Sequence, residues 1–245
     1  PEGLVVANEV IRTRASVLAD NVRKWGIGNV IVTNEDPAAV GRMGEWFDIV
    51  AVDAPCSGEG MFRKVPAARA EWSADNVRIC SQRQRRILAD AYNAVAPGGY
   101  LIYSTCTFNR FENEDNVEWF AEEFDMEDAG IDVPGEWNIV GTEAGGIRCF
   151  RFFPHLTAGE GFFCAVMRKP GMPGQSGKRP GQAIKRSIFA PVPKQDTTEI
   201  SRWAAQPGYM TFSLINENVY GYYSAVYNDM KTIAERLNAL HSGVF

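Results

Sequence analysis

The chain has 245 residues, of which 45% are hydrophobic and 22% charged, and these values are ordinary for one main folded domain. No apolar run approaches the roughly 18 residues that a membrane-spanning helix needs, and no secretory leader is recognisable. The five cysteines are widely spaced and form no CxxC pair, which argues against a disulfide framework and against bound metal. We therefore expect a monomer with reduced thiols in the cytoplasm.

The net charge of −5 is weak evidence against a nucleic-acid partner, because lysine and arginine drive phosphate binding. Local clusters matter more than the sum, and the sequence holds two. They comprise Arg78, Arg83, Arg85 and Arg86 in one stretch, and Lys178, Arg179, Lys185 and Arg186 in another. Both interpretations of these clusters, contact with RNA or a solvated surface, stay open.

Apolar runs alternate with helical periodicity through the first two-thirds of the chain. Strands are predicted at Leu4 to Ala7, Val30 to Val32, Phe47 to Val52 and Tyr100 to Tyr103, and helices at Ile11 to Trp25, Ala74 to Val95 and Asn113 to Phe124. Ser73 is the expected N-cap of the long second helix, and Pro97-Gly98-Gly99 is expected to end it. Strands that alternate with helices predict a mostly parallel sheet. Arg148 to Phe153 and Gly161 to Met167 predict an antiparallel hairpin at its edge.

The chain changes character near residue 169. Residues 170–186 are rich in glycine and proline and predict a linker between a first domain, 1–169, and the remainder, 187–245. That remainder is short and aromatic, and predicts a small α+β piece. Its expected satellite core comprises Trp203, Tyr209, Phe212, Tyr220, Tyr222, Tyr223 and Tyr227.

Acidic residues follow three successive predicted strands, where an open α/β sheet binds its ligands. They are Glu9, Asp36 and Asp53. In a nucleotide-binding fold, an acidic residue after the second strand typically accepts hydrogen bonds from ribose hydroxyls, and this role suits Glu9. Asp36, after the third strand, suits the exocyclic amine of an adenine. The alternative for any one of them is a solvated loop residue, but three in register favour a cofactor site that includes all three.

Two cysteines lie just beyond predicted strands, in polar, loop-forming sequence. Cys56 occurs in DAPCSGEG and Cys106 in STCTFN. A lone cysteine is more often a small buried hydrophobe, and we expect that of Cys80, Cys149 and Cys164. The placement of Cys56 and Cys106 instead favours a chemical role.

These motifs, together with RFFPHLTAGEGFF further on, resemble the Nop/Sun family of RNA 5-methylcytosine methyltransferases over roughly residues 3 to 169. The stretch Glu59 to Phe62 is most similar to the bacterial small-subunit ribosomal RNA methyltransferase F branch. The resemblance implies a Rossmann-like class I methyltransferase fold, S-adenosylmethionine as cofactor, and RNA, above all 16S ribosomal RNA, as substrate and partner. It also implies that Cys106 attacks the base and that Cys56 assists release of the product. By the same resemblance, residues 187–245 are expected to begin a C-terminal RNA-binding region.

The chemistry explains why such residues are needed. Addition of a thiolate at C6 of cytosine makes C5 nucleophilic enough to take a methyl group, which is covalent catalysis. Asp53 suits a hydrogen bond to N3 of the base, which eases that addition. His155, in a Pro-His turn, is expected to be structural rather than a catalytic base.

The family carries a glycine-rich cofactor loop after its first strand, and no such loop is present in this sequence. We therefore expect a fragment that lacks the first strand and is itself inactive, with two sheet edges left exposed. The alternatives are a non-catalytic RNA-binding or ribosome-assembly factor, a methyltransferase of transfer RNA, or one that acts on DNA or protein. Both cysteines together favour RNA, because the resemblance implies that a DNA enzyme uses the cysteine of the Pro-Cys motif alone.

Overall fold

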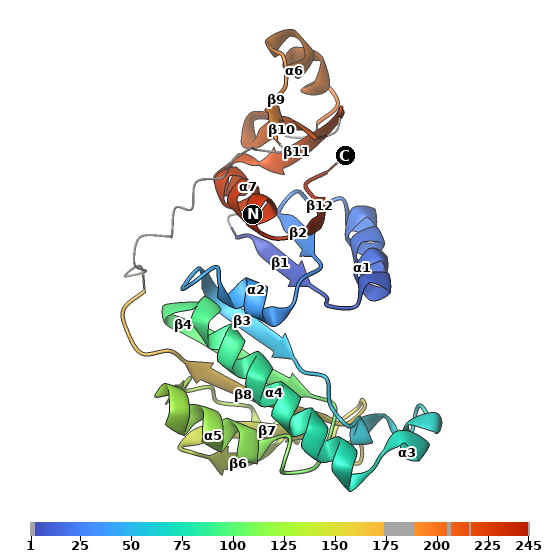
Figure 1. Cartoon of the computed structure of the whole chain (residues 1–245), viewed down its shortest axis with the longest axis vertical. Coiled ribbons are helices and arrows are strands. Elements are labelled where there is room, and N and C mark those ends of the chain that lie inside the picture. Colours follow the sequence, from blue (N-terminus) through green and yellow to red (C-terminus); the bar gives the residue numbers. More distant parts are fainter. Residues whose placement is uncertain (1–2, 174–188, 205–206, 216, 245) are drawn as a thin grey trace. The chain divides into compact units, whose positions relative to one another are not determined.

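The computed structural model describes residues 3–173, 189–204, 207–215 and 217–244 (Figure 1). The helices and strands, in chain order, are β1 Val5–Asn8, α1 Arg12–Trp25, β2 Val30–Thr33, α2 Pro37–Gly41, β3 Phe47–Asp53, α3 Ala67–Glu71, α4 Ala74–Ala94, β4 Val95–Thr105, α5 Glu114–Phe124, β5 Glu127–Asp128, β6 Val140–Ala144, β7 Ile147–Phe152, β8 Phe162–Arg168, β9 Ala190–Pro191, α6 Lys194–Ile200, β10 Met210–Ile215, β11 Asn218–Tyr223, α7 Tyr227–Arg236 and β12 Ala239–Ser242.

The chain forms two compact units. The first combines Pro1–Ala39 with Gly181–Phe245, and the second is Val40–Pro180. The expected division at residues 169 and 187 stays a prediction. Residues 174–188, which hold most of the expected linker and the second basic cluster, lie outside the described residues.

The second unit is built on a six-stranded mixed sheet with the order β3-β4-β8-β7-β6, in which β5 also pairs with β8. The pair β3–β4 is parallel, as expected for strands joined through a helix. The β7–β8 hairpin is confirmed, with Cys149 opposite Ala165 and Phe152 opposite Phe162. The fold class is confirmed as mixed α/β, but the sheet is not mostly parallel, because β8 enters antiparallel beside β4 and β5, β6 and β7 extend that antiparallel part.

Helix α4 shows how local sequence positions this sheet. The Ser73 side chain accepts a hydrogen bond from the backbone N–H of Asn76, so Ser73 caps the helix as expected. The helix ends at Ala94, and β4 begins at Val95 and continues to Thr105. The prediction that Pro97-Gly98-Gly99 ends the helix is wrong, because these residues lie inside β4. The chain passes directly from the helix into the strand.

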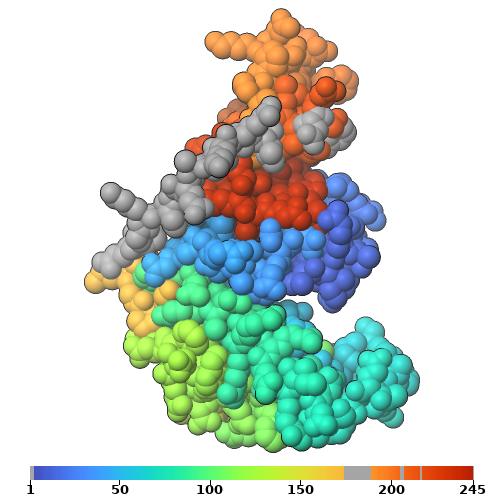
Figure 2. Space-filling view, viewed as in Figure 1, coloured from blue at the N-terminus to red at the C-terminus, as the bar shows by residue number. Residues whose placement is uncertain are grey.

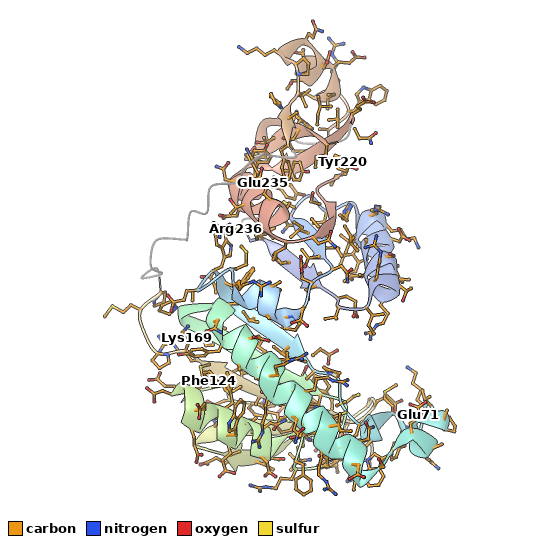
Figure 3. The ribbon with its side chains drawn as sticks, viewed as in Figure 1. Glu71, Phe124, Lys169, Tyr220, Glu235 and Arg236 are labelled. Atoms are coloured by element: carbon orange, nitrogen blue, oxygen red, sulfur yellow. The ribbon has the colours of Figure 1, made fainter. Side chains whose placement is uncertain are left out.

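The core of the second unit lies between the sheet and two helices, α4 and α5. Leu88 of α4, Phe120 of α5 and Tyr103 of β4 are fully buried within it. In the space-filling view the atoms of α4 and α5 cover this face of the sheet (Figure 2). At one end of the core, the buried Lys169 ammonium donates to the Val95 carbonyl and lies 4.1 Å from the Tyr92 ring centre (Figure 3).

The first unit holds two three-stranded sheets, β1-β2-β12 and β11-β10-β9. Strands β1 and β2 are parallel, and the late strand β12 pairs antiparallel with β2. The expected C-terminal α+β piece is present, and one of its strands completes the N-terminal sheet. Its aromatic core is smaller than predicted: Tyr222 is fully buried, whereas Trp203 and Tyr209 are 87% and 72% exposed.

Candidate active site

The structure brings Cys56 and Cys106 into contact. Cys56 follows β3 and Cys106 follows β4, and because these neighbouring strands are parallel, both loops start at the same edge of the sheet. The two Sγ atoms are 3.1 Å apart, and the backbone N–H of Cys106 donates to the Cys56 Sγ at 3.3 Å. Both side chains are half-buried. A second thiol therefore lies within hydrogen-bond distance of the predicted nucleophile.

The two thiols differ in acidity. The hydrogen bond from Cys56 lowers the pKa of Cys106 to about 7, although burial and the nearby Asp53 carboxylate act in the opposite direction. The same hydrogen bond, together with burial, raises the pKa of Cys56 above the ordinary value for a thiol. Cys106 is therefore the thiol that ionises near neutral pH, and Cys56 is the proton donor in the pair. Because the thiolate is the nucleophilic form, this asymmetry favours Cys106 as the nucleophile.

Asp53 lies at the end of β3, three residues before Cys56. Its carboxylate is exposed, and its Oδ1 is 3.4 Å from the hydroxyl oxygen of Ser104, the residue beside it on β4. Asp53, Cys56 and Cys106 thus lie at or just beyond the ends of two neighbouring strands, at one edge of the sheet. These three residues were predicted from the sequence as the chemical group of the site.

A buried carboxylate joins the two loops. Glu112 has no exposed surface, and its oxygens accept hydrogen bonds from the Ser57 backbone N–H at 3.0 Å, from Gln84 at 2.8 Å and from Asn109 at 2.7 Å. Tyr103, also fully buried, donates to the Glu112 backbone carbonyl. Glu112, Gln84 and Asn109 were not among the residues predicted from the sequence. Their residue types show that they are polar, but the sequence does not show that they are buried or that they contact one another.

The glutamate of the DAPCSGEG motif has a similar linking role. Glu59 accepts from the backbone N–H of Phe108 and from the indole of Trp72, both at 2.9 Å. Gly58, with φ +73°, provides the left-handed turn that starts the short 3₁₀ segment Glu59–Met61. The Gly60 N–H then donates to the Cys106 carbonyl at 2.9 Å. The loop after β3 is thereby held against the backbone of the nucleophile.

A buried ion pair supports the far side of the Cys106 loop. The Arg151 guanidinium contacts the Glu114 carboxylate with both Nε, at 2.6 Å, and Nη2, and donates to the Phe108 carbonyl at 2.7 Å. Burial raises the pKa of Glu114, but the hydrogen bonds from Arg151 and Thr142 outweigh it and leave that pKa below its ordinary value. Arg151 therefore ties β7 to the loop that carries Cys106.

The predicted cofactor residues Glu9 and Asp36 belong to the first unit. They follow β1 and β2, which are parallel neighbours. The Glu9 carboxylate accepts from the Ile11 N–H at 2.9 Å and pairs with Arg14 at 3.0 Å, and Asp36 accepts from the Ala38 N–H at 3.0 Å. Carboxylate oxygens accept hydrogen bonds from hydroxyls and amines, and each Glu9 oxygen keeps a second lone pair beside these contacts. The residues therefore fit the expected cofactor, while their position relative to the cysteine pair stays a prediction.

The described part of the chain was searched for metal sites and for membrane-spanning helices. Among those residues no group of three or more histidine, cysteine, aspartate or glutamate side chains has the arrangement of a metal site. None of the helices described there is both long enough and apolar enough to cross a membrane.

Solved structures resemble this one over about two-thirds of the chain. One is titled as the crystal structure of NSun6 from Pyrococcus horikoshii with SFG, with a TM-score of 0.56, 28% identity, and coverage of 68% of this chain and 41% of that chain. Another, a methyltransferase homologue from the same organism, has a TM-score of 0.55 and 28% identity over 68% of this chain and 53% of its own. The Rossmann-like methyltransferase fold is therefore confirmed.

Curated relatives point to a single family. Ribosomal RNA small subunit methyltransferase F of Pectobacterium atrosepticum is 36% identical over 212 residues, and that of Escherichia coli is 37% identical over 216 residues. Each match covers 84% of this chain and 43% of the relative, so the chain spans less than half the length of these relatives. The model of the family described as 16S rRNA methyltransferase RsmB/F matches residues 1–168. The chain belongs to the 16S rRNA methyltransferase RsmB/F family.

Proposed function

We propose that this chain is the catalytic part of an S-adenosylmethionine-dependent RNA cytosine-C5 methyltransferase that acts on 16S ribosomal RNA in the cytoplasm. The observation that carries the proposal is the contact between the Cys56 and Cys106 sulfurs at 3.1 Å, with Cys106 as the more acidic thiol. The family supports ribosomal RNA as the substrate. A binding module would have no use for two half-exposed thiols arranged in this way.

The first step is the addition of the Cys106 thiolate to C6 of a cytosine that has left its stack. The new S–C6 bond moves electron density to C5, and a hydrogen bond from an acid at N3 stabilises the adduct. Asp53, exposed at the same edge of the sheet, is the residue that we assign to N3.

The second half of the reaction removes the enzyme from the product. After C5 has gained its methyl group, a water molecule takes the C5 proton, and the electron pair of that C–H bond re-forms the C5–C6 double bond. The S–C6 bond breaks in the same step, and the Cys106 sulfur departs as a thiolate. The Cys56 thiol, a hydrogen-bond donor to that sulfur, stabilises the departing thiolate. The hydrogen bond from Cys56 therefore supports elimination, which is the role that we assign to it.

Glu9, Asp36 and Asp53 are the residues that would hold the cofactor. S-adenosylmethionine supplies an electrophilic methyl group when bound. The Glu9 carboxylate would accept from the ribose hydroxyls and Asp36 from the adenine amine, while Asp53 follows the next strand. The solved neighbour with SFG, an analogue of S-adenosylmethionine, supports this class of cofactor.

The experiment separates the two cysteines by the order of the steps, and it uses the full-length protein with 16S ribosomal RNA. Cys56→Ala should form the Cys106 adduct and release it slowly, so a protein–RNA complex should survive denaturing gel electrophoresis. Cys106→Ala should form no such complex and should not methylate, because it cannot make the S–C6 bond.

Cys80→Ala is the matched control, because Cys80 is a buried cysteine of α4 outside the pair. It should methylate without a trapped complex. A trapped complex with Cys106→Ala would reverse the assigned roles, as in a DNA enzyme. No methylation by the wild-type protein, and no complex with either variant, would instead favour a non-catalytic RNA-binding factor.

A further inference from the structure

A shallow groove lies beside the two catalytic loops. Its first part, about 560 Å³, is lined by Arg63, Phe108, Phe153, Pro154 and His155. A second part, about 500 Å³, shares three of these residues and adds side chains of α3 and its neighbours, including Arg69 and Trp72. All of them belong to the second unit, and Figure 3 marks α3 by its last residue, Glu71. Asp53, Cys56 and Cys106 are not among the residues that line this groove.

The groove begins at the backbone of the Cys106 loop. Phe108 follows Cys106 by two residues, and Gly60, whose N–H donates to the Cys106 carbonyl, also lines the groove. A Cβ atom at Gly161 would lie 2.1 Å from the Phe108 ring, so that loop packs directly on the ring. An RNA strand whose target base lies at Cys106 would therefore place a neighbouring nucleotide close to this groove.

Aromatic rings form a row along the groove. Phe108 stacks on Phe153, with ring centres 5.7 Å apart and an angle of 23° between the planes. Phe153 in turn lies 5.5 Å from His155 at 36°. His155 is exposed, and Trp72 on the other side is 41% exposed. Exposed ring faces of this kind are what an unstacked nucleic-acid base binds.

Positive charge accompanies the rings. Arg69 is exposed, and the Arg63 guanidinium is oriented by the Gly159 carbonyl at 2.9 Å and by Glu160 at 3.3 Å. Glu59 is the one carboxylate among the residues that line the groove, and its oxygens accept hydrogen bonds from Trp72 and Phe108. The groove is thus locally basic, although the whole chain has a net charge of −5. Two guanidinium groups beside aromatic rings suit the phosphates and the unpaired bases of a single strand.

We propose that this groove binds the nucleotide next to the target cytosine in single-stranded RNA. The base stacks on the row formed by Phe153 and His155, and Arg63 and Arg69 bind the adjoining phosphates. This inference rests on the proposed function and adds to it a subsite that selects single-stranded RNA. Duplex RNA does not satisfy it, because paired bases keep their faces within the stack.

The test uses a short single-stranded RNA in which 2-aminopurine stands either 5′ or 3′ of the target cytosine, with the full-length protein. Stacking on His155 should quench the 2-aminopurine fluorescence at one of the two positions. His155→Ala should abolish that quenching, and His155→Phe should restore it, because it retains an aromatic face. His155→Ala and Arg69→Ala should each weaken RNA binding about tenfold and raise KM for RNA, with kcat nearly unchanged.

Trp137→Ala and Lys24→Ala are the matched controls, because they remove an exposed aromatic ring and an exposed cation outside the groove. Both should bind RNA and quench as the wild type does. Wild-type binding and quenching in both His155→Ala and Arg69→Ala, with methylation intact, would overturn the groove assignment. A wild-type protein that binds RNA through His155 and Arg69 but methylates none would support the groove and contradict the proposed function.

Discussion

The surroundings of each sulfur separate Cys106 from the other cysteines. Burial raises the pKa of Cys80 and Cys164, and it raises that of Cys149 to about 12. Cys106 differs because a neighbouring thiol donates to its sulfur, and this lowers its pKa to about 7. The chemical distinction between cysteines that share one protein thus comes from a single contact of 3.1 Å.

The acidity of Cys106 predicts how its reactivity depends on pH. Only the thiolate is alkylated, so a lowered pKa keeps Cys106 reactive as the pH falls, until the pH passes below about 7. In Cys56→Ala the donor is lost, and the midpoint should move upward toward the ordinary thiol value. The measurement is the rate of iodoacetamide labelling of the Cys106 peptide between pH 5 and pH 10, by mass spectrometry. Equal midpoints in the two proteins would show that Cys56 does not stabilise the thiolate.

Glu112 carries the next prediction at the residue scale. Glu112→Ala leaves the Ser57 N–H and the amides of Gln84 and Asn109 without their buried acceptor. We expect a loss of about 2–4 kcal/mol in the free energy of unfolding, measured by urea denaturation, together with loss of methylation. Glu118→Ala, on the exposed side of α5, should change that free energy by less than about 0.5 kcal/mol. A Glu112→Ala protein as stable as this control would contradict a linking role for Glu112.

At the scale of elements, three loops next to the neighbouring strands β3, β4 and β8 share one backbone contact surface. A Cβ atom at Gly60 would lie 2.5 Å from the Gly161 carbonyl oxygen and 2.8 Å from that of Cys106. Both atoms belong to the backbone, so no side-chain rotation relieves the clash. The three loops that carry Gly60, Cys106 and Gly161 are therefore closed to a side chain at this point.

This contact predicts the effect of Gly60→Ala. The extra methyl group should push the loop after β3 away from the Cys106 loop, which separates the two thiols. Because small misplacements of reacting groups are costly, we expect the methylation rate to fall about 100-fold. Gly141→Ala in β6, where a Cβ meets nothing within 4 Å, should keep the wild-type rate. Single-turnover methylation of RNA compares the two variants, and equal rates would place the Gly60 contact outside the site.

At the scale of the whole molecule, the end of the chain completes a sheet that begins near its start. Strand β12 pairs with β2, His241 lies opposite Val32, and the Asn34 N–H donates to the Asn238 carbonyl at 3.0 Å. Leu240 packs on the small core formed by Val22 and Val32. The first unit therefore depends on segments about 200 residues apart in sequence.

Truncation tests this dependence. Removal of residues 238–245 takes away the pairing partner of β2, so hydrogen exchange of the Val30–Thr33 amides should quicken about 100-fold, equivalent to about 3 kcal/mol. Exchange in β3 and β4 should not change, because those strands belong to the second unit. Trp203→Ala, at a side chain 87% exposed, serves as the control and should leave β2 protected. Unchanged protection after truncation would mean that β1 alone stabilises β2.

Local sequence determined much of this protein. Strands were predicted at Leu4 to Ala7 and Phe47 to Val52, and the structure has them at Val5–Asn8 and Phe47–Asp53. Helix α4 with its Ser73 cap and the polar loops that follow β3 and β4 were also predicted, because each depends on neighbouring residues. The motifs in those loops also indicated the family. Only the tertiary structure decided that the two sulfurs lie 3.1 Å apart, that Glu112 is buried between the loops, and that β12 joins β2. Each of these depends on contacts between segments that are far apart in sequence. Hydrophobic periodicity and secondary-structure propensity depend on nearby residues and do not predict such contacts.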